Sequence, residues 1–191
     1  MKNKFFILLL LCLIIIYRTA LSQNIPRGVI PEMCESVVKF DDRIVFNCNN
    51  NITVLIKVID NQILQIHYSQ NNFNLKNKSF AVIDSVLSET VSFGFAEQPD
   101  SYEIYTAKLI IRVNKSPFKI RVFDKWQKWL TEDYDKLGCV IDSPHISCSK
   151  LLKGDERIYG LGEKNGSLIR NGAKFKMWNS DKPCYSVDED P

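Results

Sequence analysis

The sequence predicts an all-β protein, an antiparallel β-sandwich that follows an N-terminal signal peptide. Three observations lead to this fold class. Short runs of β-branched and aromatic residues are separated by turn residues, with a turn roughly every 8–12 residues. Apolar and polar side chains alternate in the clearest run, residues 102–113. No amphipathic pattern is long enough to predict a complete helix, and the sequence contains no internal repeat.

Composition and charge are those of a globular domain. The chain has 191 residues, of which 45% are hydrophobic and 25% charged. Its net charge of +3 comes from Lys2, Lys4 and Arg18, because the first 22 residues contain no acid and the rest holds 22 basic and 22 acidic residues. Such a balance gives no basis for a basic patch, so we expect no nucleic-acid partner.

Residues 1–22 have the pattern of a signal peptide. A positive start is followed by the apolar run 5–16, which is long enough for a signal peptide and shorter than the roughly twenty residues of a membrane-spanning helix. Ala20-Leu21-Ser22 is a small-x-small cleavage site. The alternative is an uncleaved N-terminal anchor, and Arg18 is the irregular feature of the cleavage region.

Cleavage would start the mature chain near Gln23, with residues 23–191 forming one β-sandwich domain. We therefore expect an exported protein, periplasmic, secreted or lumenal, with no stable membrane anchor.

The predicted strands follow one another along the chain. They occupy residues 37–40, 44–46, 52–59, 63–68, 102–113 and 118–124, with weaker signals at 80–83 and 86–87. The turns at 41–42 and 60–61 predict two hairpins. Residues 126–134 are the one candidate for a helical turn, with an aromatic-anchored loop as the alternative. Residues 137–141 and 146–152 predict a last hairpin.

Export would make disulfides possible. Five cysteines remain after the predicted cleavage: Cys34, Cys48, Cys139, Cys148 and Cys184. The first two are equidistant from Asp41 and the next two from Ser143-Pro144, so each pair would face across a hairpin within disulfide reach. The alternative is buried, reduced cysteines, and the odd number leaves at least one thiol free or paired between chains. No cysteine or histidine spacing indicates a metal site.

Residues 159–185, YGLGEKNGSLIRNGAKFKMWNSDKPCY, are the candidate ligand-binding stretch. Gly160 and Gly162 remove alternate side chains from one face of a strand, which indicates close approach of another backbone or a ligand. The three glycines that include Gly166 have the spacing GxGxxxG rather than GxGxxG, and no helix pattern follows. This excludes a dinucleotide-binding loop, and we expect no cofactor.

The segment YGLGEKNGSLIRNGAKFKMWNSD resembles the N-terminal β-domain of glycoside hydrolase family 31, the α-glucosidase and α-xylosidase family. Upstream, SPFKIRVFD at residues 116–124 is similar to the hairpin that precedes this motif in the family. The resemblance extends over residues 23–191. Ser180 stands where the family usually has threonine, and Lys182-Pro183-Cys184 replaces a small-aromatic-glycine run. The second departure leaves the path of the loop after Asp181 open.

The resemblance implies a galactose-mutarotase-like sandwich in front of a catalytic barrel. Family members cleave α-glycosidic bonds with retention, using two aspartates of the barrel whose carboxyl groups lie about 5–5.5 Å apart. Such a barrel needs roughly 250 further residues. We therefore expect no catalytic residue in this chain, which would be a fragment or truncated product. Its implied partners are the barrel of the same polypeptide and an α-linked glucoside or xyloside oligosaccharide.

Asp181 is the one substrate-binding residue that the resemblance implies, because the family uses this aspartate to accept hydrogen bonds from substrate hydroxyl groups. From the sequence alone, Asp181 is more typical of a turn before Lys182-Pro183 than of a ligand contact. Trp178 is more typical of a core or interface residue than of a sugar platform. Glu163 is more typical of a structural ion pair than of a catalytic partner for Asp181. Two other functions stay open: a stand-alone carbohydrate-binding sandwich without catalytic activity, and a structural β-domain without a ligand.

Overall fold

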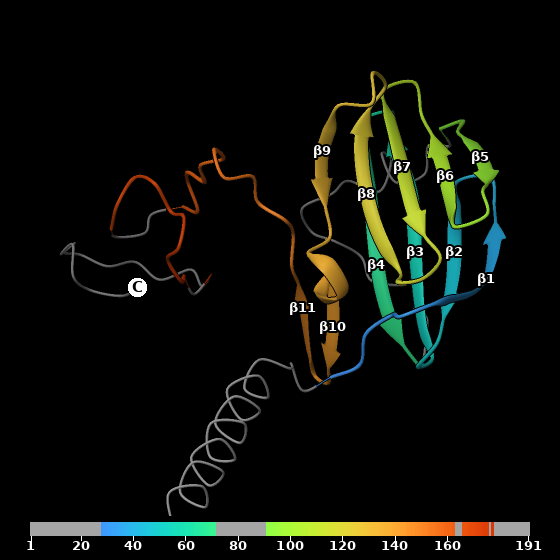
Figure 1. Cartoon of the computed structure of the whole chain (residues 1–191), viewed down its shortest axis with the longest axis horizontal. Helices are drawn as coiled ribbons and strands as arrows, with labels where there is room; N and C mark the ends of the chain where they lie inside the picture. The colour runs from blue at the N-terminus through green and yellow to red at the C-terminus, as the bar shows by residue number, and fades with distance from the viewer. Residues whose placement is uncertain (1–27, 72–90, 163–165, 176, 178–191) are drawn as a thin grey trace, which may run out of the picture. The chain divides into compact units, whose positions relative to one another are not determined.

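The computed structural model describes residues 28–71, 91–162, 166–175 and 177. The chain forms two compact units, Met1–Leu151 and Leu152–Pro191. The described part of the first unit is an antiparallel β-sandwich, which confirms the predicted all-β fold class (Figure 1). The predicted signal peptide at residues 1–22 lies outside the described residues.

The first sheet has four antiparallel strands in chain order. They are β1 (Cys34–Lys39), β2 (Arg43–Cys48), β3 (Ile52–Asp60) and β4 (Ile63–Gln70). Both predicted hairpins are confirmed, since Lys39 pairs with Ile44 and Asp60 with Ile63. In the asparagine-rich turn between β2 and β3, Asn50 has a φ angle of 59°. Asparagine tolerates this left-handed conformation better than most residues.

The second sheet has five antiparallel strands, also in chain order. They are β5 (Gly94–Glu97), β6 (Ser101–Tyr105), β7 (Leu109–Asn114), β8 (Lys119–Asp124) and β9 (Trp129–Glu132). The predicted strand 118–124 is confirmed as β8. The short strand β5 was not predicted from the sequence.

The prediction of a single strand over residues 102–113 is wrong, because the chain reverses direction inside it. Thr106 forms the turn between β6 and β7: its Oγ1 accepts the N–H groups of Leu109 at 2.8 Å and Lys108 at 3.2 Å. The same hydroxyl donates to the carbonyl of Asn61 at 2.7 Å. Side-chain hydrogen bonds of this kind compete with strand pairing. The sequence did contain a signal for the turn. In one continuous strand all core residues would be even-numbered or all odd-numbered, whereas here Ile104 is even-numbered and Leu109 is odd-numbered.

The candidate helical turn at residues 126–134 is also wrong. Trp129–Glu132 form β9, which pairs antiparallel with β8. The chain reverses before β9 because Asp124 Oδ1 accepts the N–H groups of Trp126 at 2.9 Å and Lys128 at 2.8 Å. A single 3₁₀ turn, Asp135–Leu137, follows β9.

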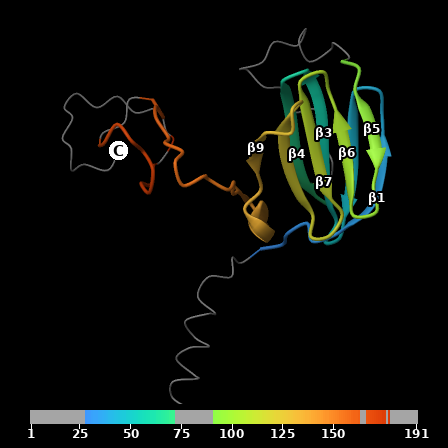
Figure 2. The same cartoon turned by 45° about the horizontal axis from the view of Figure 1, so that its top comes forward.

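The core lies between the two sheets, which face each other in both views (Figures 1 and 2). Phe46 is fully buried at its centre, with ring centroids 5.6 Å from Tyr102 and 5.9 Å from Phe118. Burial alternates along β2, β7 and β8, as expected for strands with one face in a core. Strand β3 also buries Leu55 on its other face.

A separate two-stranded sheet ends the first unit. Strands β10 (Cys139–Asp142) and β11 (His145–Cys148) pair antiparallel, which confirms the predicted last hairpin. Val29 joins β10 through two backbone hydrogen bonds with Ile141, both 2.9 Å. In the part of the chain that the structure describes, no helix is long and apolar enough to cross a membrane.

Candidate functional site

The candidate ligand-binding stretch lies in the second unit, and only part of it belongs to the described residues. Asp181 lies outside them, as do Trp178 and Glu163. The structure therefore leaves the predicted role of Asp181 as a prediction. It does describe the segment that leads toward Asp181, residues 158–162 and 166–175.

Gly160 and Gly162 adopt a backbone conformation that favours glycine. The expected strand is absent from residues 158–162, and the φ angles are 87° at Gly160, 71° at Leu161 and 78° at Gly162. A Cβ atom at either glycine would meet nothing within 4 Å. The expected strand is therefore wrong at residues 158–162, where the two glycines supply the left-handed conformation that other residues adopt at a cost.

Two neighbouring residues hold this segment in shape. Arg170 donates its N–H to the carbonyl of Ile158 at 2.8 Å and its Nε–H to the carbonyl of Gly160 at 3.3 Å. Asn171 accepts the N–H of Ile158 at 2.8 Å through Oδ1 and donates from Nδ2 to the carbonyl of Glu156 at 2.9 Å. The Arg170 guanidinium also lies over the ring of Phe175, 5.0 Å from its centroid. The conformation of this segment thus depends on hydrogen bonds to its backbone.

Apolar side chains in the second unit are largely exposed. The described examples are Leu152, Ile158, Tyr159, Leu168, Ile169 and Met177, with exposed fractions from 40% to 75%. Such side chains normally bury part of their surface in a folded protein. The segment therefore presents an apolar surface that its described neighbours leave open.

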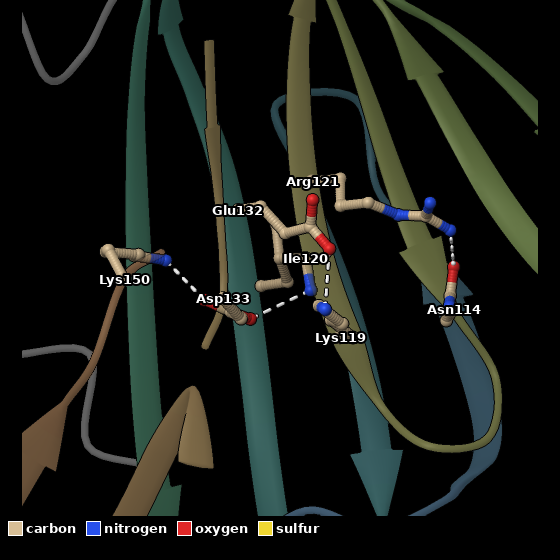
Figure 3. A network of polar contacts seen from close by, with 7 residues as sticks. All are labelled: Asn114, Lys119, Ile120, Arg121, Glu132, Asp133 and Lys150. Atoms are coloured by element: carbon tan, nitrogen blue, oxygen red, sulfur yellow. Dashed lines mark hydrogen bonds and ion pairs between the residues drawn. The ribbon is translucent and has the colours of Figure 1, made fainter. Parts of the chain in front are cut away.

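A buried carboxylate fixes the last strands of the sandwich before the chain enters the second unit. Figure 3 shows Asp133 between the backbone of Ile120 and the side chain of Lys150. Asp133 is 2% exposed; its Oδ2 accepts the N–H of Ile120 at 2.8 Å, and its Oδ1 accepts a hydrogen bond from Lys150 Nζ. Nearby, Lys119 and Glu132 form an ion pair at 2.5 Å (Figure 3). A buried charge requires such partners, so Asp133 joins β8 to the segment that follows β11.

Gly138 is required by the same arrangement. A Cβ atom at this position would lie 2.5 Å from Cβ and 2.6 Å from Cγ of Asp133. The carbonyl of Gly138 accepts the N–H of Ser149 at 3.0 Å. Sequence reasoning missed Asp133 because its partners, Ile120 and Lys150, are distant in the chain, and it missed Gly138 because only the burial of Asp133 makes a glycine necessary there.

A second polar cluster lies on β6 and β7. Glu103 Oε1 accepts hydrogen bonds from Arg112, at 2.7 Å, and Glu103 Oε2 accepts one from the Tyr105 hydroxyl. The Tyr105 hydrogen bond, together with the Arg112 guanidinium, lowers the pKa of Glu103 despite its burial. Arg112 also lies over the ring of Phe123, at 5.3 Å. Each charge has a partner, and the cluster therefore stabilises the sheet.

Metal-binding groups are not assembled in the described ranges: no set of three or more histidine, cysteine, aspartate or glutamate residues there could hold a metal ion. His67 lies in β4 and His145 in β11. The described residues thus contain stabilising polar contacts, and the predicted ligand contact stays with Asp181.

Comparison with known proteins adds what the geometry leaves open. The family model of the glycosyl hydrolase 31 N-terminal galactose mutarotase-like domain matches residues 53–191. The matched range begins in β3 and contains all the strands that follow it, together with the whole of the candidate stretch.

Individual relatives agree with this match. A Flavobacterium johnsoniae GH31 dextranase, solved in complex with isomaltotriose, has a TM-score of 0.77 and 42% identity, covering 85% of this chain and 20% of its own. The alpha-glucosidase 2 of Bacillus thermoamyloliquefaciens is 26% identical over 136 residues, 71% of this chain and 17% of the relative. The cycloalternan-forming enzyme of Listeria monocytogenes, in complex with a pentasaccharide substrate, shares the fold with a TM-score of 0.60 at 18% identity, over 75% of this chain and 14% of its own. The chain spans a fifth or less of the length of these relatives.

Proposed function

The chain belongs to the glycosyl hydrolase 31 N-terminal galactose mutarotase-like domain family, and we propose that it is the N-terminal domain of an exported, retaining α-glycosidase. In this proposal the domain contributes carbohydrate binding at the mouth of the active site. The observation that carries it is the family match, which runs through the candidate stretch to residue 191 and includes Asp181.

Asp181 is the proposed contact with substrate. A carboxylate accepts hydrogen bonds from two sugar hydroxyl groups and needs no proton transfer to do so. The segment that precedes Asp181 is held by Arg170 and Asn171.

The proposed catalytic aspartates belong to a barrel of the same polypeptide. The relatives support this, because the match covers only 20% of the dextranase and 17% of the alpha-glucosidase. The exposed apolar side chains of the second unit, such as Tyr159 and Leu168, also fit a surface that further protein would cover.

The proposed substrate is an oligosaccharide of α-linked glucose. The dextranase, 42% identical, was solved with isomaltotriose and in another structure with glucose. An α-xyloside is the second candidate, because an α-xylosidase from Xanthomonas citri shares the fold, with a TM-score of 0.55 at 18% identity.

Export is a further part of the proposal and rests on the pattern of residues 1–22. N-terminal sequencing of protein recovered from the secretory route should begin at Gln23. Recovery of chains that still begin at Met1 would contradict cleavage.

Hydrolysis of isomaltotriose by the complete polypeptide tests the role of Asp181. We expect Asp181→Ala to lower kcat/KM by about 10- to 100-fold, because a hydrogen bond between a charged group and substrate is lost. Asp155→Ala is the matched control, since this exposed carboxylate lies in the same unit but outside the motif. The circular dichroism spectrum should be the same for all three proteins.

Two results would contradict the proposal. If Asp181→Ala left the kinetics unchanged, Asp181 would not be a contact with substrate. Turnover of an aryl α-glucoside by residues 1–191 alone would place catalysis inside this chain. Binding of isomaltotriose by the 191-residue chain, with no open reading frame for a barrel, would instead favour a stand-alone carbohydrate-binding sandwich.

A further inference from the structure

We propose that the sandwich carries two cross-strand disulfides, Cys34–Cys48 and Cys139–Cys148, which form when the chain meets an external disulfide oxidant. The structure holds these four cysteines as free thiols. It also places each cysteine directly opposite its partner in an antiparallel ladder. This inference is independent of sugar binding and of Asp181.

Strand register brings the two pairs together. Cys34 is the pairing partner of Cys48 on β1 and β2, and Cys139 is the partner of Cys148 on β10 and β11. Partners in an antiparallel ladder have Cα atoms about 4.5–5.5 Å apart. Disulfides span Cα separations of about 4.4–6.8 Å. Each bond therefore fits the existing backbone.

A β-bulge produces the first pair. Between Lys39 and Ser36 the register of β1 and β2 is regular, and it would place Cys34 opposite Asn49 if it continued. The register shifts between Cys34 and Ser36, and this shift brings Cys34 opposite Cys48. Bulges of this kind re-aim side chains at sheet edges.

The two cysteines of the first pair influence each other's ionisation. Interaction with Cys48 lowers the pKa of the Cys34 thiol, and interaction with Cys34 together with burial raises the pKa of Cys48. In the second pair, burial raises the pKa of Cys139 to about 12, and the neighbouring Cys148 contributes to the shift. Cys148 is exposed and Cys34 is half-buried, whereas their partners are buried. One cysteine of each pair is thus accessible to an oxidant.

The difference in exposure between the two cysteines of each pair indicates which thiol reacts first. The accessible thiolate, Cys34 or Cys148, attacks one sulfur of the external disulfide and releases the first external thiol. The buried partner then loses its proton and attacks the mixed disulfide, releasing the second external thiol. Each bridge forms as two protein thiols lose two electrons and two protons, and the external disulfide is reduced to two thiols.

Each bridge joins an exposed strand to a strand that contributes to the core. β1 is an edge strand of its sheet, with most of its side chains exposed. β10 and β11 form a two-stranded sheet, and every residue of β11 is exposed. A two-stranded hairpin is marginally stable by itself. A covalent bond across each hairpin restricts the unfolded chain and ties the exposed strands β1 and β11 to their buried partners.

Peptide mapping of the full chain tests the pairing. Cys12→Ser and Cys184→Ser leave the four paired cysteines, and the folded protein is oxidised with glutathione disulfide before the remaining thiols are alkylated. Trypsin separates Cys34 from Cys48 at Lys39 and Arg43, and cleavage before Asp142 separates Cys139 from Cys148. We expect the Cys34–Cys48 and Cys139–Cys148 linked peptides, whereas oxidation in urea should give a mixture of pairings.

Thermal unfolding provides an independent measurement. The midpoint of the oxidised protein should exceed that of the reduced protein by about 10 °C. Cys34→Ser with Cys48→Ser should remove part of this increase and leave the Cys139–Cys148 linked peptide intact; Cys139→Ser with Cys148→Ser should do the converse. Alkylation of all four thiols in the folded, oxidised protein, or crossed pairs such as Cys34–Cys139, would overturn the proposal.

Discussion

Phe46 and Tyr159 show how differently the two units of the chain are held together. Phe46 is fully buried between two sheets, where its ring lies against Tyr102 and Phe118. Tyr159, in the second unit, is 56% exposed, and the backbone beside it is held by Arg170 and Asn171. Apolar burial therefore stabilises the sandwich, whereas the described residues of the second unit are held by hydrogen bonds that compete with water.

Replacing one aromatic side chain in each unit should give the largest contrast. Phe46→Ala removes a ring from a closed core, and we expect a loss of about 4 kcal/mol in the free energy of unfolding. Tyr159→Ala should change it by less than about 0.5 kcal/mol, because most of its side chain is in water. Urea denaturation measures both. A similar loss for the two variants would mean that the second unit has a core of its own.

One glycine in each unit should give the next contrast. Gly138→Ala places a methyl group against Asp133 and should cost about 3 kcal/mol, since the buried carboxylate would have to move. Gly162→Ala meets no atom, but its φ of 78° should cost about 1 kcal/mol.

Thermal unfolding and amide hydrogen exchange distinguish the steric clash at Gly138 from the backbone strain at Gly162. Gly138→Ala should lower the thermal midpoint of the sandwich, whereas Gly162→Ala should increase amide hydrogen exchange at residues 158–162 only. A normal midpoint for Gly138→Ala would show that Asp133 can shift without loss of its contacts.

The smallest contrast concerns pH. The pKa of Glu103 is lowered by its hydrogen bond from Tyr105 and by Arg112, so its contribution to stability is present above the ordinary carboxyl pKa and is lost as pH falls through its lowered folded value. Glu103→Gln should therefore lower stability by about 1 kcal/mol at neutral pH and flatten its fall below about pH 4.

Glu156→Gln is the matched control in the second unit, where Glu156 accepts the N–H of Lys153 at 2.7 Å. We expect it to leave the acid dependence of the sandwich unchanged. If the stability of Glu103→Gln fell at low pH as steeply as that of the unaltered protein, the role of the Glu103 cluster would be contradicted.

Local patterns predicted most of the fold because its hairpins are local. The apolar residues on either side of Asp41-Asp42 predict the hairpin, but the regular register of β1 and β2 is shifted by one residue from the arrangement centred on Asp41. The failures at residues 102–113 and 126–134 have a shared cause. Thr106 and Asp124 form turns through side-chain hydrogen bonds, and alternation alone does not show such bonds.

The site was less predictable for a different reason. Asp181 was identified through the family motif, and nothing in its spacing distinguishes a substrate contact from a turn. Asp133 is one of several acidic residues that follow Trp129, and its sequence does not show that it is buried while Asp135 is exposed. That difference arises from Ile120 and Lys150, more than ten residues away on either side. Contacts between distant segments decide which acid carries a structural role.

The order of the strands also bears on how the protein folds as it is made. Every described strand pairs with its nearest described neighbour in sequence, so each sheet can form by adding hairpins one at a time. The first sheet can be complete before β6 has been synthesised, and its apolar face, which includes Phe46, then has no partner sheet. Closure of the sandwich waits for the strands up to β8. A chaperone that binds apolar surface would therefore find its target in this interval, before the second sheet covers the first.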